Sequence, residues 1–312
     1  MKMLRFLLAC ALLCTTSPVM AQEKVPIETL DFPAGQATVD VPTQFYFPRL
    51  YVRVTIGGRG MDFILDSGAG GILIDAQILK QLGIQTTGTQ TEVAARSFTA
   101  GLAIVPEMRI GDIVMHNVPV HATTFASEET SQVQRAGLLG YDFLGRVGLT
   151  IDYRSGRVTA MRPDQYDPPA PTTVSQVLPI RLDTRVPTVA MKINGVTAEN
   201  MVVDTGAATD LMLFDHFTKS HPEVLATNVA LRLRTMANWK GVGGSFDATG
   251  YSLKSVDLGM FHLTNFAALA VTSVGSYPYN ADGVVGPGIL GHFTVGFDYG
   301  GGKMYLVHQS GQ

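Results

Sequence analysis

Two short segments of this 312-residue chain place a carboxylate, a hydroxyl and a glycine in the same order. Residues 66–69 read Asp-Ser-Gly-Ala, and residues 204–207, 138 positions later, read Asp-Thr-Gly-Ala. Each segment follows three apolar residues, as at the end of a buried strand. Two carboxylates a few ångström apart cannot both ionise cheaply, so such a pair shares one proton. The matching contexts predict that Asp66 and Asp204 form one paired site.

The elements around these segments recur in the same order in both halves of the chain. The order is an alternating strand with a glycine turn, the carboxylate strand, a short helix, a loop-and-strand region, an apolar pair with glycine, and a closing strand. Repetition of a whole domain predicts duplication, with a site between the copies. We expect these elements at 51–56, 63–65, 75–82, up to 111, 138–140 and 149–153, and again at 189–193, 201–203, 214–219, up to 259, 284–286 and 295–299.

A proline-rich stretch, 163–171, separates the two halves and cannot form a central strand. We therefore predict four segments. They are a signal peptide at 1–21, an N-terminal lobe at 22–162, a linker at 163–178 and a C-terminal lobe at 179–312.

The N-terminus has the pattern of a targeting segment. Lys2 and Arg5 start a short apolar run, 6–14, and small residues at 19–21 predict cleavage before Gln22. The run is too short to span a bilayer, and no later segment reaches the required length. A periplasmic or secreted location follows, and the start of the mature chain, about 22–36, could serve as a short pro-segment.

Composition limits the class of protein. A content of 46% hydrophobic residues supports a large core, and a net charge of −3 gives no basic excess for nucleic acid. Scattered glycine and proline favour a turn-rich, all-β fold. Both cysteines, Cys10 and Cys14, lie in the predicted signal peptide, so the mature chain has no thiol nucleophile. The histidines, His216 and His221 included, lack the spacing of a metal site, and we expect no metal, no cofactor and a monomer.

The doubled Asp-Ser/Thr-Gly-Ala motif, with its apolar approach and a later apolar-apolar-Gly, resembles the lobe of aspartic peptidases. The resemblance covers about 36–308. A single chain with two lobes resembles the pepsin-like enzymes, while alanine after the glycine resembles the retropepsin-like ones, since pepsins usually carry serine there. The chain resembles a bilobal retropepsin-like protein of the bacterial type. This resemblance implies two pseudo-twofold-related lobes of mostly antiparallel strands, with short helices and a cleft between the lobes.

The resemblance also implies the roles of the motif residues. Asp66 and Asp204 would hold a water: the ionised carboxylate takes a proton as the water attacks a peptide carbonyl, and the protonated one donates to the carbonyl oxygen. The remaining residues would support this pair. Gly68 and Gly206 would bring the backbone close, and the hydroxyls of Ser67 and Thr205 would cross-link the two loops, as in the family.

Ala69 and Ala207 support a hypothesis about pH. A serine at either position could donate a hydrogen bond to the ionised carboxylate and lower its pKa, whereas alanine cannot. We therefore expect an activity optimum in the mildly acidic to near-neutral range.

A glycine-rich segment, 240–246, resembles the flap tip of retropepsins. It contains Gly241, Gly243 and Gly244, and Trp239 beside it would either line the cleft or pack as an ordinary aromatic residue. The corresponding part of the first half, 87–101, has few glycines, so we expect the main flap to come from the second half.

These observations predict an exported aspartic endopeptidase that acts on extended peptides or proteins. Two alternatives stay open: a catalytically silent peptide-binding protein on the same scaffold, and a paired-carboxylate hydrolase of cell-wall glycans. A carboxylate separation beyond the reach of one bridging water would favour the glycan hydrolase. A second matched pair, Asp152 and Asp298, is interpreted as structural, at strand ends.

Overall fold

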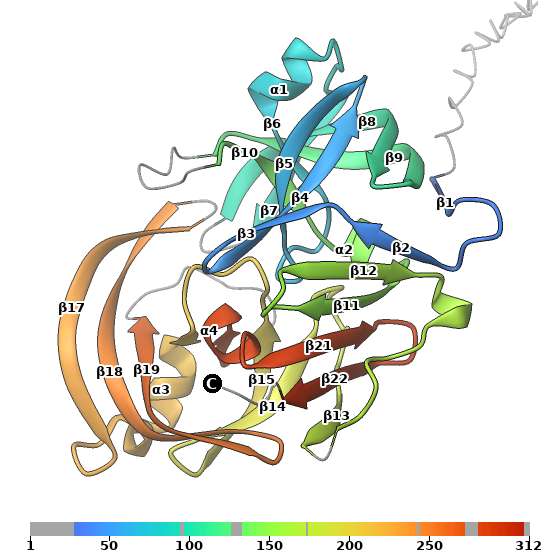
Figure 1. Cartoon of the computed structure of the whole chain (residues 1–312). Coiled ribbons are helices and arrows are strands. Elements are labelled where there is room, and N and C mark those ends of the chain that lie inside the picture. The colour runs from blue at the N-terminus through green and yellow to red at the C-terminus, as the bar shows by residue number, and fades with distance from the viewer. Residues whose placement is uncertain are drawn as a thin grey trace, which may run out of the picture.

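The computed structural model describes residues 28–93, 97–125, 133–172, 174–241, 244–271 and 280–308. The predicted signal peptide lies outside these ranges. Strands make up 56% of the structure and helices 11%, which confirms an all-β fold. Figure 1 shows two lobes, built from the two halves of the chain, above and beside a smaller sheet.

The first lobe is one mixed sheet. Its strands follow the order β1-β9-β6-β10-β5-β4-β8-β7, with β3 paired to β4. The bounds are β1 (Thr29–Asp31), β3 (Thr43–Tyr46), β4 (Arg49–Ile56), β5 (Arg59–Leu65), β6 (Leu73–Asp75), α1 (Ala76–Gln81), β7 (Gly88–Val93), β8 (Ser97–Ile110), β9 (Ile113–Thr123) and β10 (Arg135–Leu139).

The second lobe repeats this plan. Its strands follow the order β14-β15-β20-β16-β19-β18-β17. The bounds are β14 (Thr188–Ile193), β15 (Val196–Val203), β16 (Leu211–Leu213), α3 (Asp215–Ser220), η2 (Pro222–Leu225), β17 (Ala230–Gly241), β18 (Gly244–Leu258), β19 (Phe261–Val271) and β20 (Gly283–Val285).

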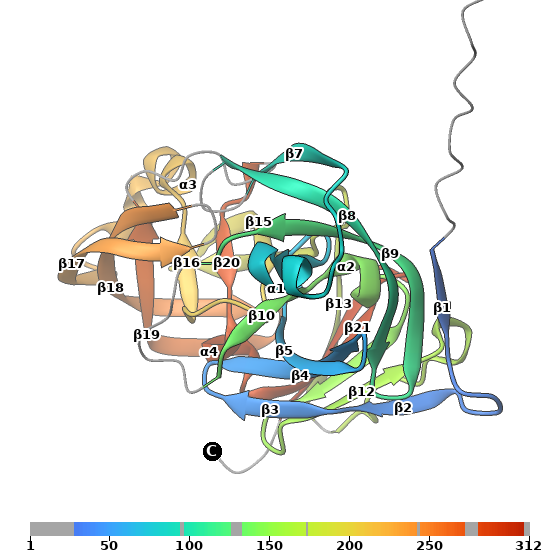
Figure 2. The ribbon, with the colours of Figure 1, turned by 90° about the horizontal axis from the view of Figure 1, so that it is seen from above.

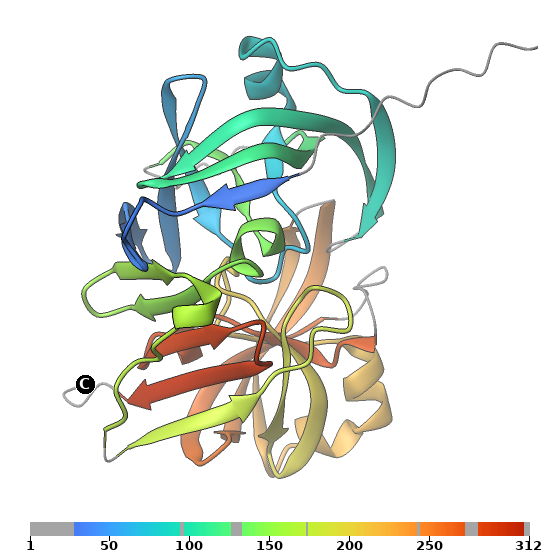
Figure 3. The ribbon, with the colours of Figure 1, turned by 90° about the vertical axis from the view of Figure 1, so that its right-hand side faces the viewer.

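Both halves contribute to the remaining sheet, whose strand order is β13-β22-β21-β11-β12-β2 (Figure 3). Its central pair, β11 with β21, is symmetric: Gly148 lies opposite Asp298, and Asp152 lies opposite Thr294. This register is the one that a pseudo-twofold axis between the halves requires. The bounds are β2 (Thr38–Val41), α2 (Tyr141–Leu144), β11 (Gly148–Asp152), β12 (Arg157–Met161), η1 (Pro163–Gln165), β13 (Ser175–Pro179), α4 (Pro287–Leu290), β21 (Phe293–Asp298) and β22 (Lys303–His308).

The segment predicted as a linker, 163–178, is partly built into this sheet. It holds η1 and most of β13, an edge strand whose proline is its last residue and so interrupts little pairing. Between them, Tyr166 and Pro169 lie against the sheet at Gly148 and Gly296, where a Cβ would meet them at 2.1 and 2.7 Å.

The hairpins that lead into the two carboxylate strands form for local reasons. The β4–β5 turn holds Gly57 and Gly58 at positive φ, and the β14–β15 turn holds Asn194 and Gly195 there. Two successive residues at positive φ are typical of the tight turns that match the twist of paired strands. The Asn-Gly sequence of the second turn is typical of such hairpins.

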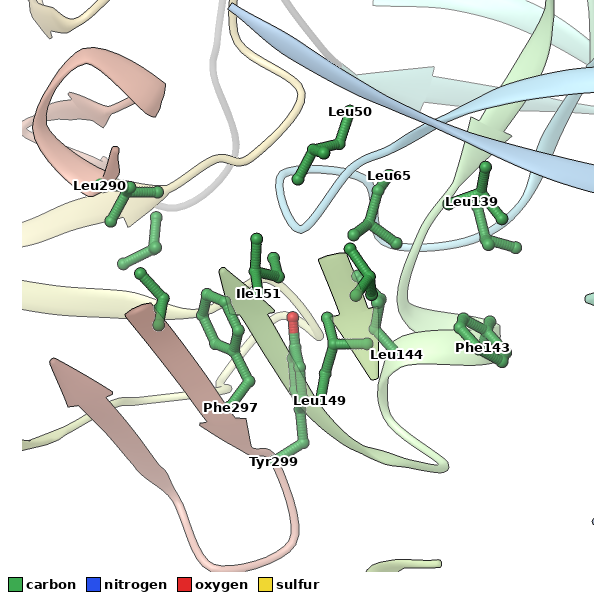
Figure 4. Close-up of a cluster of buried hydrophobic side chains, with 14 of the residues drawn as sticks. Leu50, Leu65, Leu139, Phe143, Leu144, Leu149, Ile151, Leu290, Phe297 and Tyr299 are labelled. Atoms are coloured by element: carbon green, nitrogen blue, oxygen red, sulfur yellow. The ribbon is translucent and has the colours of Figure 1, made fainter. Parts of the chain in front are cut away.

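The lobes and the shared sheet enclose a continuous apolar core. Figure 4 shows side chains from both halves meeting in it. Because they pack on each other rather than in separate cores, the position of one lobe depends on the other. The labelled residues are Leu50, Leu65, Leu139, Phe143, Leu144, Leu149, Ile151, Leu290, Phe297 and Tyr299.

The possible pro-segment, 22–36, is described from Glu28 onward. Its strand β1 pairs with β9, with Thr29 opposite His116, and runs along the side of the first lobe (Figure 2). The described part of the segment is therefore an edge strand of this lobe.

Candidate active site

Two buried strands bring the carboxylates to the junction of the lobes. β5 lies parallel to β10, and β15 lies parallel to β20. At the strand ends the N–H of Asp66 donates to the carbonyl of Leu139 at 3.1 Å, and that of Asp204 to the carbonyl of Val285 at 2.9 Å. The same arrangement in each lobe fixes the point where each chain leaves its sheet.

Hydroxyl groups join the two loops below the carboxylates. Ser67 Oγ donates to the carbonyl of Val203 at 2.7 Å and accepts the N–H of Thr205 at 3.0 Å. In return, Thr205 Oγ1 donates to the carbonyl of Leu65 at 2.7 Å and accepts the N–H of Ser67 at 3.0 Å. These reciprocal bonds are buried, and they hold the two loops at a fixed separation.

The carboxyl groups of Asp66 and Asp204 are hydrogen-bonded to each other and only 8% and 9% exposed. Each lies against the glycine of the opposite loop. A Cβ on Gly68 would lie 2.6 Å from Asp204 Cγ, and one on Gly206 would lie 2.6 Å from Asp66 Cγ. Only glycine therefore leaves space for the pair.

The environment distinguishes the two acids. Burial raises the pKa of Asp66 well above its ordinary value, and the negative charge of Asp204 raises it further. Burial also raises the pKa of Asp204, but hydrogen bonds from the Gly206 N–H, at 2.8 Å, and from Asp66 oppose that effect. Asp66 accepts the Gly68 N–H but also faces the Asp204 charge, so these contacts favour the proton on Asp66 and the charge on Asp204.

The sequence also matches a known family over part of its length. Residues 52–143 match the family model for aspartyl proteases. This part of the chain is similar to aspartyl proteases, which supports an aspartic-peptidase-like family. No curated protein matches the chain. The matched segment runs from β4 to α2, includes Asp66, and supports a protease-like function.

Apolar clusters flank the carboxyl pair, one in each lobe. The cluster in the first lobe contains Ala69, and the cluster in the second lobe is packed against Ala207. Apart from Ala69 and Ala207, sequence analysis did not assign these side chains to the site. Ile64 on β5 and Val202 on β15 nevertheless alternate with residues of the main core. The first cluster is Tyr51, Ile64, Ala69, Leu73, Val133 and Leu138, with Phe98 and Phe125; the second is Val186, Val202, Met212, Phe214, Phe246, Ala248, Val271, Ala281 and Val284, with Ala207 and Leu269.

The residues predicted as a flap lie on the β17–β18 hairpin. Trp239 is opposite Phe246 and Gly241 is opposite Gly244, whereas Gly243 and the side chain of Trp239 lie outside the described part of the protein. The first half forms a corresponding hairpin, β7–β8, despite its few glycines. Figures 1 and 3 show the two hairpins extending to the same side of the molecule.

Other site types receive no support from the described residues. They contain no group of three or more His, Cys, Asp or Glu side chains that could hold a metal ion. Within the same ranges, no helix is long and apolar enough to cross a membrane.

Proposed function

We propose that this protein is an exported aspartic endopeptidase that hydrolyses peptide bonds with a water activated by Asp66 and Asp204. The observation that carries the proposal is the buried, hydrogen-bonded carboxyl pair held by reciprocal bonds between two loops. The predicted signal peptide supports action in the periplasm or outside the cell.

The asymmetry of the pair suggests a role for each acid. Asp204, which holds the charge, takes a proton from the attacking water. Asp66, which holds the proton, donates it to the carbonyl oxygen of the scissile peptide. In the collapse of the tetrahedral intermediate the C–N bond breaks and the C=O bond re-forms. One hydroxyl of the intermediate returns a proton to Asp66, and the proton on Asp204 passes to the leaving amine.

The contact between the carboxyls disfavours the alternative of a glycan hydrolase. Paired carboxylates that cut glycosidic bonds stand about 5–9.5 Å apart, because a sugar ring or a water must fit between them. Asp66 and Asp204 are instead directly hydrogen-bonded. A silent binding protein would also have no use for two buried acids, whose desolvation costs stability.

Cleavage of an unbiased peptide library tests the proposal. Wild type is expected to cleave, and Asp66→Ala and Asp204→Ala each to lose activity by about 10³-fold or more. Asp152→Asn and Asp298→Asn are matched controls, since these acids accept N–H groups in turns after the closing strands and should leave cleavage unchanged. Cleavage by Asp66→Ala and Asp204→Ala at the wild-type rate would refute the assignment of the two acids. Absence of cleavage by wild type would favour a binding protein.

A further inference from the structure

An arginine from the first lobe reaches the carboxylate loop of the second lobe. Arg49 is the first residue of β4 and is half-buried. Its Nε donates a hydrogen bond of 3.1 Å to the carbonyl oxygen of Gly206, 157 residues later in the chain. Gly206 contacts both acids, because its N–H donates to Asp204 Oδ1 and its Cα faces Asp66.

The carbonyl that accepts this bond is part of the peptide unit joining Gly206 to Ala207. The N–H of the same unit, on Ala207, points back at Asp204: it donates to the Asp204 backbone carbonyl at 3.4 Å and also lowers the pKa of the Asp204 carboxyl group. A guanidinium group that donates to the carbonyl oxygen of a peptide unit polarises that unit. The N–H of the same peptide unit then becomes a better hydrogen-bond donor. Arg49 is therefore linked to Asp204 through one peptide bond.

No arginine occupies the corresponding place in the second half. Thr188 lies opposite Val202 in the second lobe as Tyr51 lies opposite Ile64 in the first. The two residues before Thr188 are Val186 and Pro187, whose side chains cannot donate a hydrogen bond. The Gly68 carbonyl of the first loop thus receives no equivalent bond from the start of β14.

Other titratable groups near the pair cannot replace this charge. Tyr153 and Tyr299, at the ends of the two closing strands, are buried, and burial raises the pKa of each phenol, so both are neutral. The charge of Arg49 lowers the pKa of both acids. Among the groups whose charge acts on the pair in the described structure, Arg49 supplies the positive one.

We propose that Arg49 is a positioning residue that, through the Gly206–Ala207 peptide, keeps the negative charge of the pair on Asp204 and its proton on Asp66. This inference rests on the proposed function, since it determines which acid acts as the base. It adds one side chain from the other lobe to the contacts that make a nearly symmetric site asymmetric.

Titration of the two carboxyl groups by ¹³C NMR tests the inference without requiring activity. The resonances are assigned with Asp66→Asn and Asp204→Asn, and titrations are compared among wild type, Arg49→Met and Arg49→Lys. Arg49→Met should move both titrations to higher pH by about 0.5 to 1 unit, more for Asp204 than for Asp66. Arg49→Lys keeps the charge and should titrate closer to wild type. The pH profile of kcat/KM should move in the same direction.

Arg53→Met is the matched control. Arg53 lies on the same strand, is 53% exposed, and pairs with Asp62 at 3.0 Å, so its loss should leave the titrations unchanged. Unchanged titration in a folded Arg49→Met protein would overturn the inference. If Arg49→Met does not fold, Arg49→Gln removes the charge while keeping a hydrogen-bond donor. Carboxyl titrations of Arg49→Gln that match those of wild type would also overturn the inference. Absence of cleavage by wild type would refute the proposed function, while the titration would still decide the role of Arg49.

Discussion

The two carboxylate loops share one cross-link but have different supports. In the first lobe, Asp142 on α2 accepts the Ile72 N–H at 3.2 Å and pairs at 2.8 Å with Arg185 from the second half. In the second lobe, the residue of α4 that corresponds to Asp142 is Gly288. A Cβ on Gly288 would lie 1.9 Å from the carboxylate of Asp210. One lobe thus holds its supporting acid on the helix, and the other holds it on the loop.

This difference shows which part of the site tolerates divergence. The reciprocal bonds need only a hydroxyl in each loop, and serine and threonine both provide one. The supporting layer can exchange a carboxylate between loop and helix, provided that the opposite position loses its side chain. Each lobe also receives an arginine from the other half, but Arg49 bonds to the carboxylate loop and Arg185 bonds to Asp142 on α2.

Removal of the cross-link should have the largest effect on stability. Thr205→Val leaves the Ser67 N–H and the Leu65 carbonyl buried without this partner, and we expect it to lower the free energy of unfolding by about 2–4 kcal/mol. Urea denaturation measures this value. Thr197→Val, at an exposed position of β15, should change it by less than about 0.5 kcal/mol. A Ser67→Ala effect far from that of Thr205→Val would show that the loops are not equivalent.

The supporting acids should respond in opposite directions at pH 7. Asp142→Asn removes the charge that pairs with Arg185 and should cost about 1–2 kcal/mol. Burial raises the pKa of Asp210, so its carboxylate is unfavourable in the folded protein above that pKa, and Asp210→Asn should raise stability at pH 7. Below about pH 4 wild type and Asp210→Asn should be alike, because the acid is then protonated in both states. Urea unfolding at both pH values measures these effects, and destabilisation by Asp210→Asn would contradict the comparison.

The two acids of the pair, Asp66 and Asp204, should differ in their effect on stability. A folded-state pKa above the unfolded value contributes stability that is present below the unfolded pKa and is lost as pH rises through the folded one. Wild type should therefore lose stability between about pH 4 and neutral pH. Asp66→Asn should raise the Tm at pH 7 by about 2–4 °C, and Asp204→Asn by less, since N–H groups favour the charged form of Asp204. Thermal melts of wild type and both variants at pH 4 and pH 7 measure these Tm differences. An equal rise in Tm at pH 7 for Asp66→Asn and Asp204→Asn would contradict the difference between the two acids.

The smallest expected effect is on the pH profile. Ala207→Ser adds a hydroxyl beside the ionised acid, and donation to Asp204 should move the acid limb of kcat/KM down by about 0.5 pH unit. Ala69→Ser should move it less, because Asp66 holds the proton. Wild-type activity with a maximum below about pH 3 would contradict the role given to both alanines.

Much of the fold was predictable because short-range sequence patterns indicate its strands and helices. Alternation predicted β4 and β14, and the short helices fell within one residue of α1 and α3. The β7–β8 hairpin gave no such signal, because it lacks the glycines by which the other hairpin was recognised. The proline-rich stretch predicted a linker at 163–178, but the last residues of this segment belong to β13. A proline at the last position of that edge strand loses no necessary bond.

The sequence by itself determined the identity of the two acids, because strand, turn and glycine requirements act over a few neighbouring residues and appear twice. Only the tertiary structure decided how the acids differ. Their local sequences are nearly the same, and each acid accepts an N–H group from its own loop. The distinction therefore comes from contacts across the lobes: the Arg49 bond to the Gly206 carbonyl and the hydrogen bond that Asp204 accepts from Asp66. Long-range electrostatics in a buried site depends on positions that no local pattern specifies.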